Sequence, residues 1–489
     1  MNVSRAIIKR CFPLGAVLLI SLLSYAVSGA SHALDLSWSD PLLSEPPEMK
    51  EGALGSYGSS RMSCPESRDE KAELALIEAI DLALCRNAKI AAAWADMKTQ
   101  AAALGEARAA YLPTMAGTLS RVHDRTNYPG SRFASSDIQS NTAYINLTWR
   151  LLDFGGRDAN HRAARASLDA ALASYDATVQ KTLSSVIEVY FETRRSYFSW
   201  KMFGQTEEAA QKTWLAAQRR EAGGFGARSD TLQARAALAK ASLSKIRAEG
   251  EFKKSQATLF YHTGLPAHSG LMFAPELPLH NVMPRQTLDQ WLVEVQAHHP
   301  AIVAAQLQLD AARERIHVAR SEGAPTVDLT GSIYQNGRPG QGVTPTNTRE
   351  VVVGVVLNIP IFDGFSRTYK IRGAMAQEEL KAQELVEAGR QVTADAIRAH
   401  ADATAAWSNL EMSVTLRAAA EDALASVQRK FERGAADIVE VLASQSAMID
   451  AQQESLRCVN EWMTARLRLL TFSGAWKKQE LRETVNQLN

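Results

Sequence analysis

Three short patterns contain residue types that could do chemistry, and none has the context that its chemistry requires. His298 and His299 stand together before Pro300, but no third ligand follows at the spacing of a metal site. The Asp-Phe-Gly sequence at 153–155 occurs where a strand is predicted to run into a helix, which is not the setting of the kinase motif. The glycines at 223–226 follow a predicted helix, whereas a phosphate-binding loop follows a strand. We therefore expect no catalytic residue, no metal site, no cofactor and no enzymatic activity.

The amino terminus predicts export from the cytoplasm. Basic residues at 5, 9 and 10 precede an apolar run from Leu14 to about Val27, and Ser31-His32-Ala33 offers small residues for cleavage. Residues 1–33 are therefore predicted to be a signal peptide. Cys11 precedes the apolar run, so it cannot be a lipoprotein acylation site.

The remaining cysteines are Cys64, Cys85 and Cys458. In an oxidising compartment, Cys64 and Cys85 can close a loop of about twenty residues, which contributes roughly 3 kcal/mol in the chain-entropy treatment. We expect this disulfide; the alternative is two buried thiols on unrelated elements. Cys458 lies in a helical stretch and is expected to be a small core residue.

The overall charge of the chain is too small to attract nucleic acid by long-range electrostatics. The 489 residues include 54 Lys and Arg against 53 Asp and Glu, which gives a net charge of +1.

The Asp-Phe-Gly segment belongs to a junction that occurs twice. Apolar residues at 145, 147, 149 and 151 alternate as in a strand, and after them the pattern becomes helical. The same sequence of events recurs with a constant offset of 210 residues, which predicts a tandem structural repeat. The junction residues are Asp153, Gly155, Gly156 and Arg157 in the first copy, and Asp363, Gly364 and Arg367 in the second.

Each junction leads into a helix of unusual length. Proline-free helical patterns run from Arg157 to about Ala222 and from Arg367 to about Glu432. About 65 residues at about 1.5 Å each would span roughly 100 Å. The chain is then predicted to reverse at hairpin tips that contain Gly224, Gly226 and Gly434.

Composition and periodicity predict the following organisation. After the signal peptide come an extended arm (34–70), a first repeat (71–264) with strands at about 114–122 and 142–152 around a loop (123–140), a linker (265–285), a second repeat (286–475) with strands at about 326–335 and 350–361, and a tail (476–489).

These elements predict an α+β membrane protein. Strands of about ten residues with apolar and polar faces can cross a bilayer in a barrel, but four strands cannot close one, so other copies of the chain must complete it. The alternative is a soluble β-sandwich with one face exposed to solvent. Alanine-rich helices without a sustained Leu/Ile seam favour a wall of helices over a two-stranded coiled coil.

The junctions, the Ala-Arg-Ala-Ala-Tyr-Leu-Pro sequence at 107–113 and the Glu-Val-Leu sequence at 440–442 resemble the TolC family of outer-membrane channel proteins, over roughly residues 71–475. The resemblance implies a homotrimer in the cell outer membrane, whose twelve-stranded β-barrel, four strands from each chain, contacts outer-membrane lipid and continues into a long α-helical barrel in the periplasm. It also implies a periplasmic membrane-fusion adaptor and an inner-membrane exporter as partners.

The Ala-Leu-Cys-Arg-Asn sequence at 83–87, with Cys64-Pro65 before it, most resembles the subgroup that serves type I secretion of toxins such as the adenylate cyclase-haemolysin. This implies a passive conduit for an exported protein, supplied by an ABC exporter. The alternatives are the outer-membrane channel of a multidrug efflux pump and, in another class, a periplasmic coiled-coil adaptor.

The resemblance also implies a gate at the periplasmic end, made by acidic rings. Glu440 matches the first acidic position, whereas the second falls on Ala443. Asp437, expected one turn nearer the tip on the same helix, and Asp230, at the place of Glu440 in the first copy, are the other candidates. The alternative is that all three are solvated carboxylates, which the helix dipole favours near helix starts.

Overall fold

The computed structural model describes the parts of the chain that form the helices and strands. The described residues are 73–127, 129–130, 136–267, 269–274, 287–336 and 348–472. The chain divides into two units, Met1–Glu45 and Pro46–Asn489, and all described residues belong to the second. The expected signal peptide, arm and tail, Cys64 and most of the linker lie outside the described residues.

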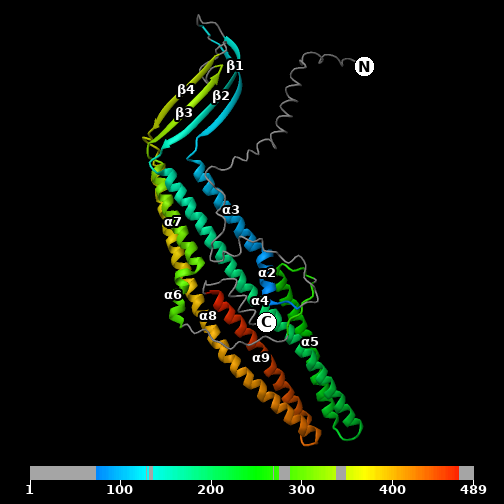
Figure 1. The fold of residues 1–489 in the computed structure, drawn as a ribbon. Coiled ribbons are helices and arrows are strands. Elements are labelled where there is room, and N and C mark those ends of the chain that lie inside the picture. Colours follow the sequence, from blue (N-terminus) through cyan, green and yellow to red (C-terminus); the bar gives the residue numbers. More distant parts are fainter. Residues whose placement is uncertain are drawn as a thin grey trace, which may run out of the picture. The chain divides into compact units, whose positions relative to one another are not determined.

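The described elements alternate between helices and antiparallel strands (Figure 1). In chain order they are α2 (Leu76–Arg86), α3 (Ala88–Ala109), β1 (Thr114–Thr126), β2 (Ser136–Leu152), α4 (Gly156–Ala222), α5 (Arg228–Thr263), α6 (Leu288–His298), α7 (Pro300–Ser321), β3 (Thr326–Gln335), β4 (Arg349–Asn358), α8 (Ser366–Glu432) and α9 (Ile438–Phe472). Helices α4 and α8 each contain 67 residues, which corresponds to about 100 Å of helix.

The strands form one antiparallel sheet in the order β1-β2-β3-β4. Pairing of β2 with β3 joins the two halves of the sequence, with Trp149 opposite Leu329 and Arg150 opposite Asp328. Strands β1 and β4 are the edges, and neither has a second neighbour among the described residues.

The loop predicted over 123–140 is wrong at both ends. Pairing of β1 with β2 continues from Arg121 opposite Asn141 to Thr126 opposite Ser136. Polar residues occupy both faces of this part of the hairpin, so no apolar alternation marks it in the sequence. Strand β4 ends at Asn358, earlier than predicted, because Pro360 has no amide hydrogen to donate to a sheet.

The two faces of the sheet differ in chemistry. One face carries an exposed apolar set: Met115, Leu119, Ile145, Trp149, Leu152, Ile333, Val351, Val353, Val355 and Leu357. On the other face polar side chains bond across strands: the Ser332 hydroxyl donates to Asn146 Oδ1 at 2.7 Å, and Arg150 pairs with Asp328 at 2.9 Å. The polar groups of one face therefore bond to one another, and the described residues leave the apolar face uncovered.

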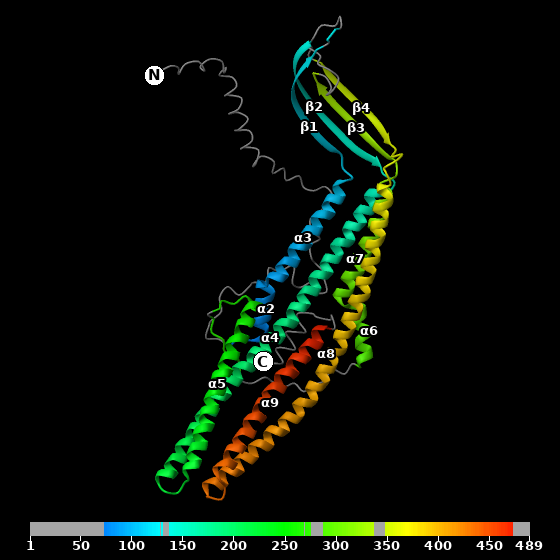
Figure 2. The same cartoon turned by 180° about the vertical axis from the view of Figure 1, so that it is seen from behind.

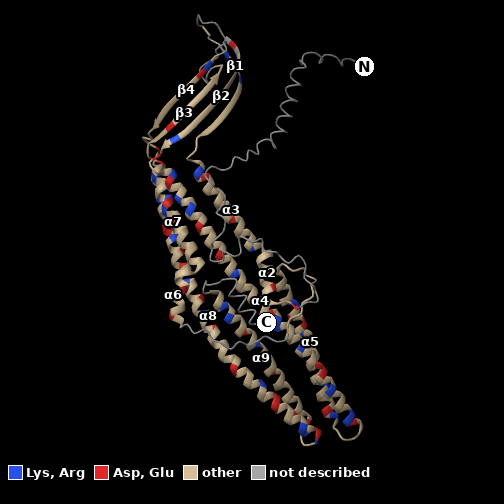
Figure 3. Ribbon diagram, viewed as in Figure 1, with Lys and Arg blue, Asp and Glu red and all other residues tan. Residues whose placement is uncertain are grey.

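The helices pack in neighbouring rows. Helix α4 lies between α3 and α7 near the sheet, and it contacts α5 and α9 farther along (Figures 1 and 2). Buried alanines on α4, α7 and α8 allow these close approaches. No helix among the described residues is both long enough and apolar enough to cross a membrane. Charged residues are frequent along the helices and sparse on the strands (Figure 3).

A large core lies around the middle of the helices, where α2 and α6 join α4, α8 and α9. It contains Phe191, Ile187 and Trp462, all almost fully buried, and the ring of Trp407 lies 4.9 Å from that of Trp462. This core anchors the helices between the sheet and the hairpin tips.

Two short breaks interrupt the helices beside this core, and each break residue caps the helix that follows. Asn87 Oδ1 accepts a hydrogen bond from the Lys89 amide at 2.9 Å, at the start of α3. His299 Nδ1 accepts from the Ala301 amide at 3.3 Å, at the start of α7. The same capping role is thus filled by an amide in one half of the chain and by an imidazole in the other.

Candidate functional site: hairpin tips and strand-to-helix junctions

The two helical hairpins reverse through the same backbone turn. Gly224 and Gly434 both have φ of +75°, a left-handed conformation that glycine adopts without strain. In each turn an amide bonds back over five residues: Phe225 to the Arg220 carbonyl at 2.9 Å, and Ala435 to the Lys430 carbonyl at 2.8 Å. Gly226 has little room for a side chain, since an added Cβ would lie 3.0 Å from the Cβ of Arg220.

The candidate acidic residues of the second tip are exposed and adjacent. Asp437 immediately precedes α9 and caps it, because its Oδ1 accepts a hydrogen bond from the Glu440 amide at 2.8 Å. Asp437 is thus one turn nearer the tip than Glu440, but the expectation that it is part of the helix is wrong, because it is the cap residue before α9. Glu440 lies in the first turn of α9, where the dipole of the helix favours a negative charge.

The first tip has a weaker version of this arrangement. Ala227 occupies the cap position of α5, and no side chain bonds to the free amides there. Asp230 lies in the first turn, and it accepts a hydrogen bond from the Ser229 hydroxyl at 3.2 Å. The start of α5 thus has one acidic residue, Asp230, where the start of α9 has two, Asp437 and Glu440.

The two tips touch through an aromatic contact. The Arg220 guanidinium at the end of α4 lies 4.5 Å from the centre of the Phe431 ring at the end of α8. Farther from the tips, Gln445 on α9 donates to the Thr213 hydroxyl on α4 at 3.3 Å. These contacts hold the ends of the hairpins against each other.

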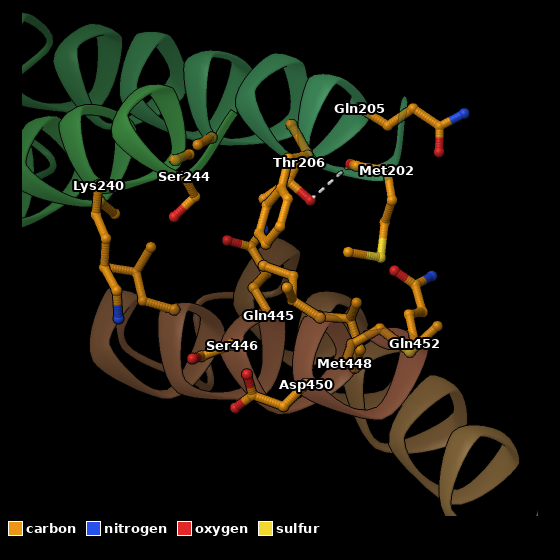
Figure 4. A pocket seen from close by; sticks show the side chains of 18 of the residues that line it. Met202, Gln205, Thr206, Lys240, Ser244, Gln445, Ser446, Met448, Asp450 and Gln452 are labelled. Carbon is orange, nitrogen blue, oxygen red and sulfur yellow. Dashed lines mark hydrogen bonds between the residues drawn. The ribbon is translucent and has the colours of Figure 1, made fainter. Parts of the chain in front are cut away.

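Between the hairpins lies a cavity of about 540 Å³. Figure 4 shows Met202, Thr206 and Ser244 on one pair of helices facing Gln445 and Met448 on the other. Its lining combines amides and hydroxyls with methionine side chains, which adapt to changes in shape. The hairpins are therefore less tightly packed here than around the core.

The strand-to-helix junctions are rigid by comparison. Asp153 Oδ2 accepts from the Arg157 amide at 2.6 Å and pairs with its guanidinium at 3.2 Å. The same guanidinium donates to the Arg150 and Leu151 carbonyls at 2.7 and 3.0 Å. At the second junction, Asp363 Oδ2 accepts from the Arg367 amide at 2.9 Å, and Arg367 Nη1 donates to the Gly323 carbonyl at 3.0 Å. Each aspartate caps its long helix.

Each junction contains two consecutive left-handed residues, one of which is phenylalanine. The order is Phe154 then Gly155 in the first copy, and Gly364 then Phe365 in the second. A non-glycine residue in this conformation costs free energy, of the order of 1 kcal/mol or more. An adjacent glycine, Gly156, sits where an added Cβ would lie 2.6 Å from Ser321 Oγ at the end of α7.

The aromatic side chains at these junctions were not among the predicted site residues. Phe154, Phe362 and Phe365 are 69%, 76% and 63% exposed. The rings of Phe362 and Phe365 meet edge to face at 5.6 Å, and the Tyr111 ring lies 5.1 Å from the Arg157 guanidinium. A phenylalanine at both junctions was visible in the sequence, but its exposure was not.

The cysteines agree in part with expectation. Cys85 is in a disulfide, and Cys64, its expected partner, lies outside the described residues. Cys458 is a buried free thiol. Among the described residues, no group of His, Cys, Asp and Glu is placed to hold a metal ion.

Comparison with known proteins gives consistent matches over most of the chain. The family described as "Outer membrane efflux protein" matches residues 79–265 and 291–475. Protein CyaE of Bordetella pertussis is 34% identical over 412 residues, which cover 84% of this chain and 86% of that protein. Proteases secretion protein PrtF of Dickeya chrysanthemi is 25% identical over 432 residues, which cover 83% and 90%.

Solved structures show the same fold. A membrane protein from Pseudomonas aeruginosa superposes with a TM-score of 0.72 at 18% identity, over 84% of this chain and 97% of that one. The sheet, the long helices and the two hairpins therefore form an architecture that is already known.

Proposed function

Because the chain belongs to the outer membrane efflux protein family, we propose that it is the outer-membrane channel of a type I secretion system and conducts an exported protein passively. The family match confirms the resemblance seen in the residues, and it places the chain in the outer membrane with its helices in the periplasm. A family of channels favours this function over that of a coiled-coil adaptor.

The working unit in this proposal is a homotrimer. In the part of the chain that the structure describes, strands β1 and β4 are open edges and nothing covers the apolar face of the sheet. Open edges in lipid would leave amides and carbonyls without hydrogen bonds, at a cost of several kcal/mol for each group. Three copies joined β4 to β1 would close a twelve-stranded barrel, with the face around Arg150 and Asp328 lining its lumen.

The long helices would continue this barrel into the periplasm. Each chain contributes α4 and α8, each of 67 residues, with the shorter helices packed between and beside them. Nothing in this arrangement requires a fuel, so the direction of transport would come from an ABC exporter and a membrane-fusion adaptor that act on the hairpins.

The gate in this proposal is at the hairpin tips. Three copies would bring Glu440 and Asp437 together near the axis, where carboxylates repel one another and attract cations. Opening would move the hairpins apart, so the Arg220 contact with Phe431 and the Gln445 bond to Thr213 would have to break. An adaptor that binds the open form better would shift the equilibrium toward it.

The cargo is proposed to be a protein, and the observation that carries this is the 34% identity with Protein CyaE over most of both chains. The secretion protein PrtF, named for proteases, supports the same class of cargo. Efflux of small toxic compounds is the second candidate, because the family itself is described as efflux proteins.

The decisive experiment deletes the gene in the native cell and restores it on a plasmid. Loss of one or more proteins from the culture medium, with unchanged susceptibility to drugs, would support secretion. Raised drug susceptibility with an unchanged set of medium proteins would support efflux. Crosslinking of outer-membrane fractions should give a trimer; a monomer with all four strands protected from exchange would contradict the channel itself.

A further inference from the structure

The apolar face of the sheet becomes cationic toward the loop end. On β1, Met115 and Leu119 are followed on the same face by Arg121, His123 and Arg125, since alternate residues share a face. On β4, the valines at 351, 353 and 355 end at Arg349, which is opposite Gln335. The side chains of all four basic residues are exposed.

Two of these arginines have no partner in the described part of the chain. No hydrogen bond or ion pair is formed there by Arg125 or Arg349. Arg121 donates to the neutral Gln139 amide oxygen at 3.3 Å. His123 lies 3.3 Å from Asp137, which is opposite Arg125 on the neighbouring strand. Within the described residues, none of the three guanidinium groups forms an ion pair with a carboxylate, although Arg125 has Asp137 opposite it.

The opposite face of the sheet does not share this excess of positive charge. There Arg150 is neutralised by Asp328, and Glu350 lies on the same face. An exposed cation on that polar face would be solvated by water in the lumen of the proposed barrel. These arginines instead lie on the face that is apolar nearer the helices, beside the polar side chains of Asp137, Gln139 and Asn141.

The position of these residues along the strands matches one edge of a bilayer. The exposed rings of Phe362 and Phe365 stand at the helix end, as interfacial aromatics do. On this face of β4 the apolar residues run from Leu357 to Val351, six residues or about 20 Å of strand, and the exposed Ile359 and Ile361 follow before the helix. Arg349 is two residues beyond Val351, and so lies just outside the apolar band.

We propose that Arg121, Arg125 and Arg349, with His123, form a site for the phosphate groups of anionic lipid in the outer leaflet of the outer membrane. The helices mark the periplasmic end, so the arginines lie at the outer surface. Guanidinium groups bind phosphate through two parallel hydrogen bonds, which suits them to this ligand better than ammonium groups. The inference rests on the proposed barrel, in which β4 of one copy would bring Arg349 to the seam with β1 of the next.

The test uses the full-length trimer, purified in mild detergent and transferred to phosphatidylcholine vesicles with or without a phosphorylated glycolipid of the lipid A type. Retained glycolipid is counted by native mass spectrometry. The triple variant R121Q/R125Q/R349Q should bind it about tenfold less or weaker still, given the contribution of each basic residue near a charged surface. The control R165Q/R235Q/R247Q removes the same charge from exposed helical positions and should bind as the unmodified protein does.

Further arms separate the sources of phosphate and guard against misfolding. Dephosphorylated glycolipid should not be retained by the unmodified protein, and excess inorganic phosphate should not displace the phosphorylated lipid. Displacement by phosphate alone would indicate a free-anion site and overturn the proposal, as would equal retention by the two triple variants. If the glutamine variant fails to assemble, R121K/R125K/R349K should assemble and retain less lipid; full retention there would contradict a guanidinium-specific site.

Conductance in the same vesicles keeps this proposal distinct from the proposed function. If the trimer conducts ions but does not bind the phosphorylated lipid, the proposed lipid site is contradicted and the proposed channel function stands. If the unmodified protein neither conducts ions nor forms a trimer, the proposed channel function is contradicted, whether or not the protein binds lipid.

Discussion

The carboxylate of Asp437 accepts a hydrogen bond from the backbone amide of Glu440 at 2.8 Å, and this bond begins helix α9. The same carboxylate is thus a helix cap and, in the proposed channel, a charge at the periplasmic end. Ala227 holds the corresponding place in the first hairpin and caps nothing. Substitutions of Asp437 must therefore separate loss of charge from loss of the cap.

The gate prediction uses changes that preserve the cap. Asn caps helices as well as Asp does, so D437N with E440Q removes two charges from each chain and keeps the turn. We expect weaker selectivity for cations and weaker block by multivalent cations, measured as single-channel conductance in planar bilayers. D402N with E411Q, exposed on mid-helix α8, is the matched control and should change neither property. Unchanged selectivity in the first pair would place Asp437 and Glu440 outside the constriction.

The His299 cap predicts a stability that depends on pH. Burial lowers the pKa of its imidazole, against the opposing effect of Asp395 on α8. Nδ1 must be unprotonated to accept a hydrogen bond from the Ala301 amide. The stability that this cap contributes is therefore fully present above the pKa of an unfolded histidine, about 6.5. It is lost as the pH falls from there toward the lower pKa of His299 in the folded protein. The melting temperature of the purified protein should therefore fall more steeply below about pH 6.5 than that of H299N does.

Asn87 offers the matched exchange for this prediction. The variant H299N copies the cap of α3 and should lose the extra dependence on pH, whereas N87H should acquire one. Identical melting profiles for H299N and the unmodified protein between pH 5 and 7 would show that protonation of His299 is not linked to folding.

Close packing at the first junction predicts that G156A destabilises the protein. The added Cβ would lie 2.6 Å from Ser321 Oγ and 3.3 Å from Asp153 Oδ2. Rotation of the serine relieves part of the contact, so we expect a loss of about 1 to 2 kcal/mol. Chemical denaturation of the detergent-solubilised protein measures it.

Two controls accompany this change. The double variant G156A/S321A should recover part of the loss, as a coupling between the two positions requires. G204A, where nothing lies within 4 Å of the added Cβ, should be neutral or stabilising in the middle of α4. Equal effects of G156A and G204A would show that the contact with α7 is unimportant.

Cys85 is in a disulfide, and we predict that its partner is Cys64. Digestion of unreduced protein followed by mass spectrometry should yield a peptide that links the two. Alkylation of Cys64 in the unreduced protein would mean that Cys85 pairs elsewhere. C64S and C85S should lower stability by similar amounts, since either one opens the same loop.

Local signals in the sequence located the elements that position the candidate site. Gly224 and Gly434 mark the two hairpin tips. The change from strand alternation to helical spacing marks both strand-to-helix junctions. Other features depend on contacts that no local pattern contains. Arg220 and Phe431 are more than two hundred residues apart in sequence, and the strand around His123 lacks an apolar side that would mark it.

The hydrogen bonds between Arg150 and Asp328 join residues 178 positions apart, and this has a consequence for how the protein matures. A chain delivered from its amino terminus presents β1 and β2 long before β3 exists. During that interval the inner edge of β2 has no neighbour and invites pairing with any other extended chain. Delivery must therefore outpace aggregation, or a periplasmic chaperone must shield the first hairpin until the second half arrives.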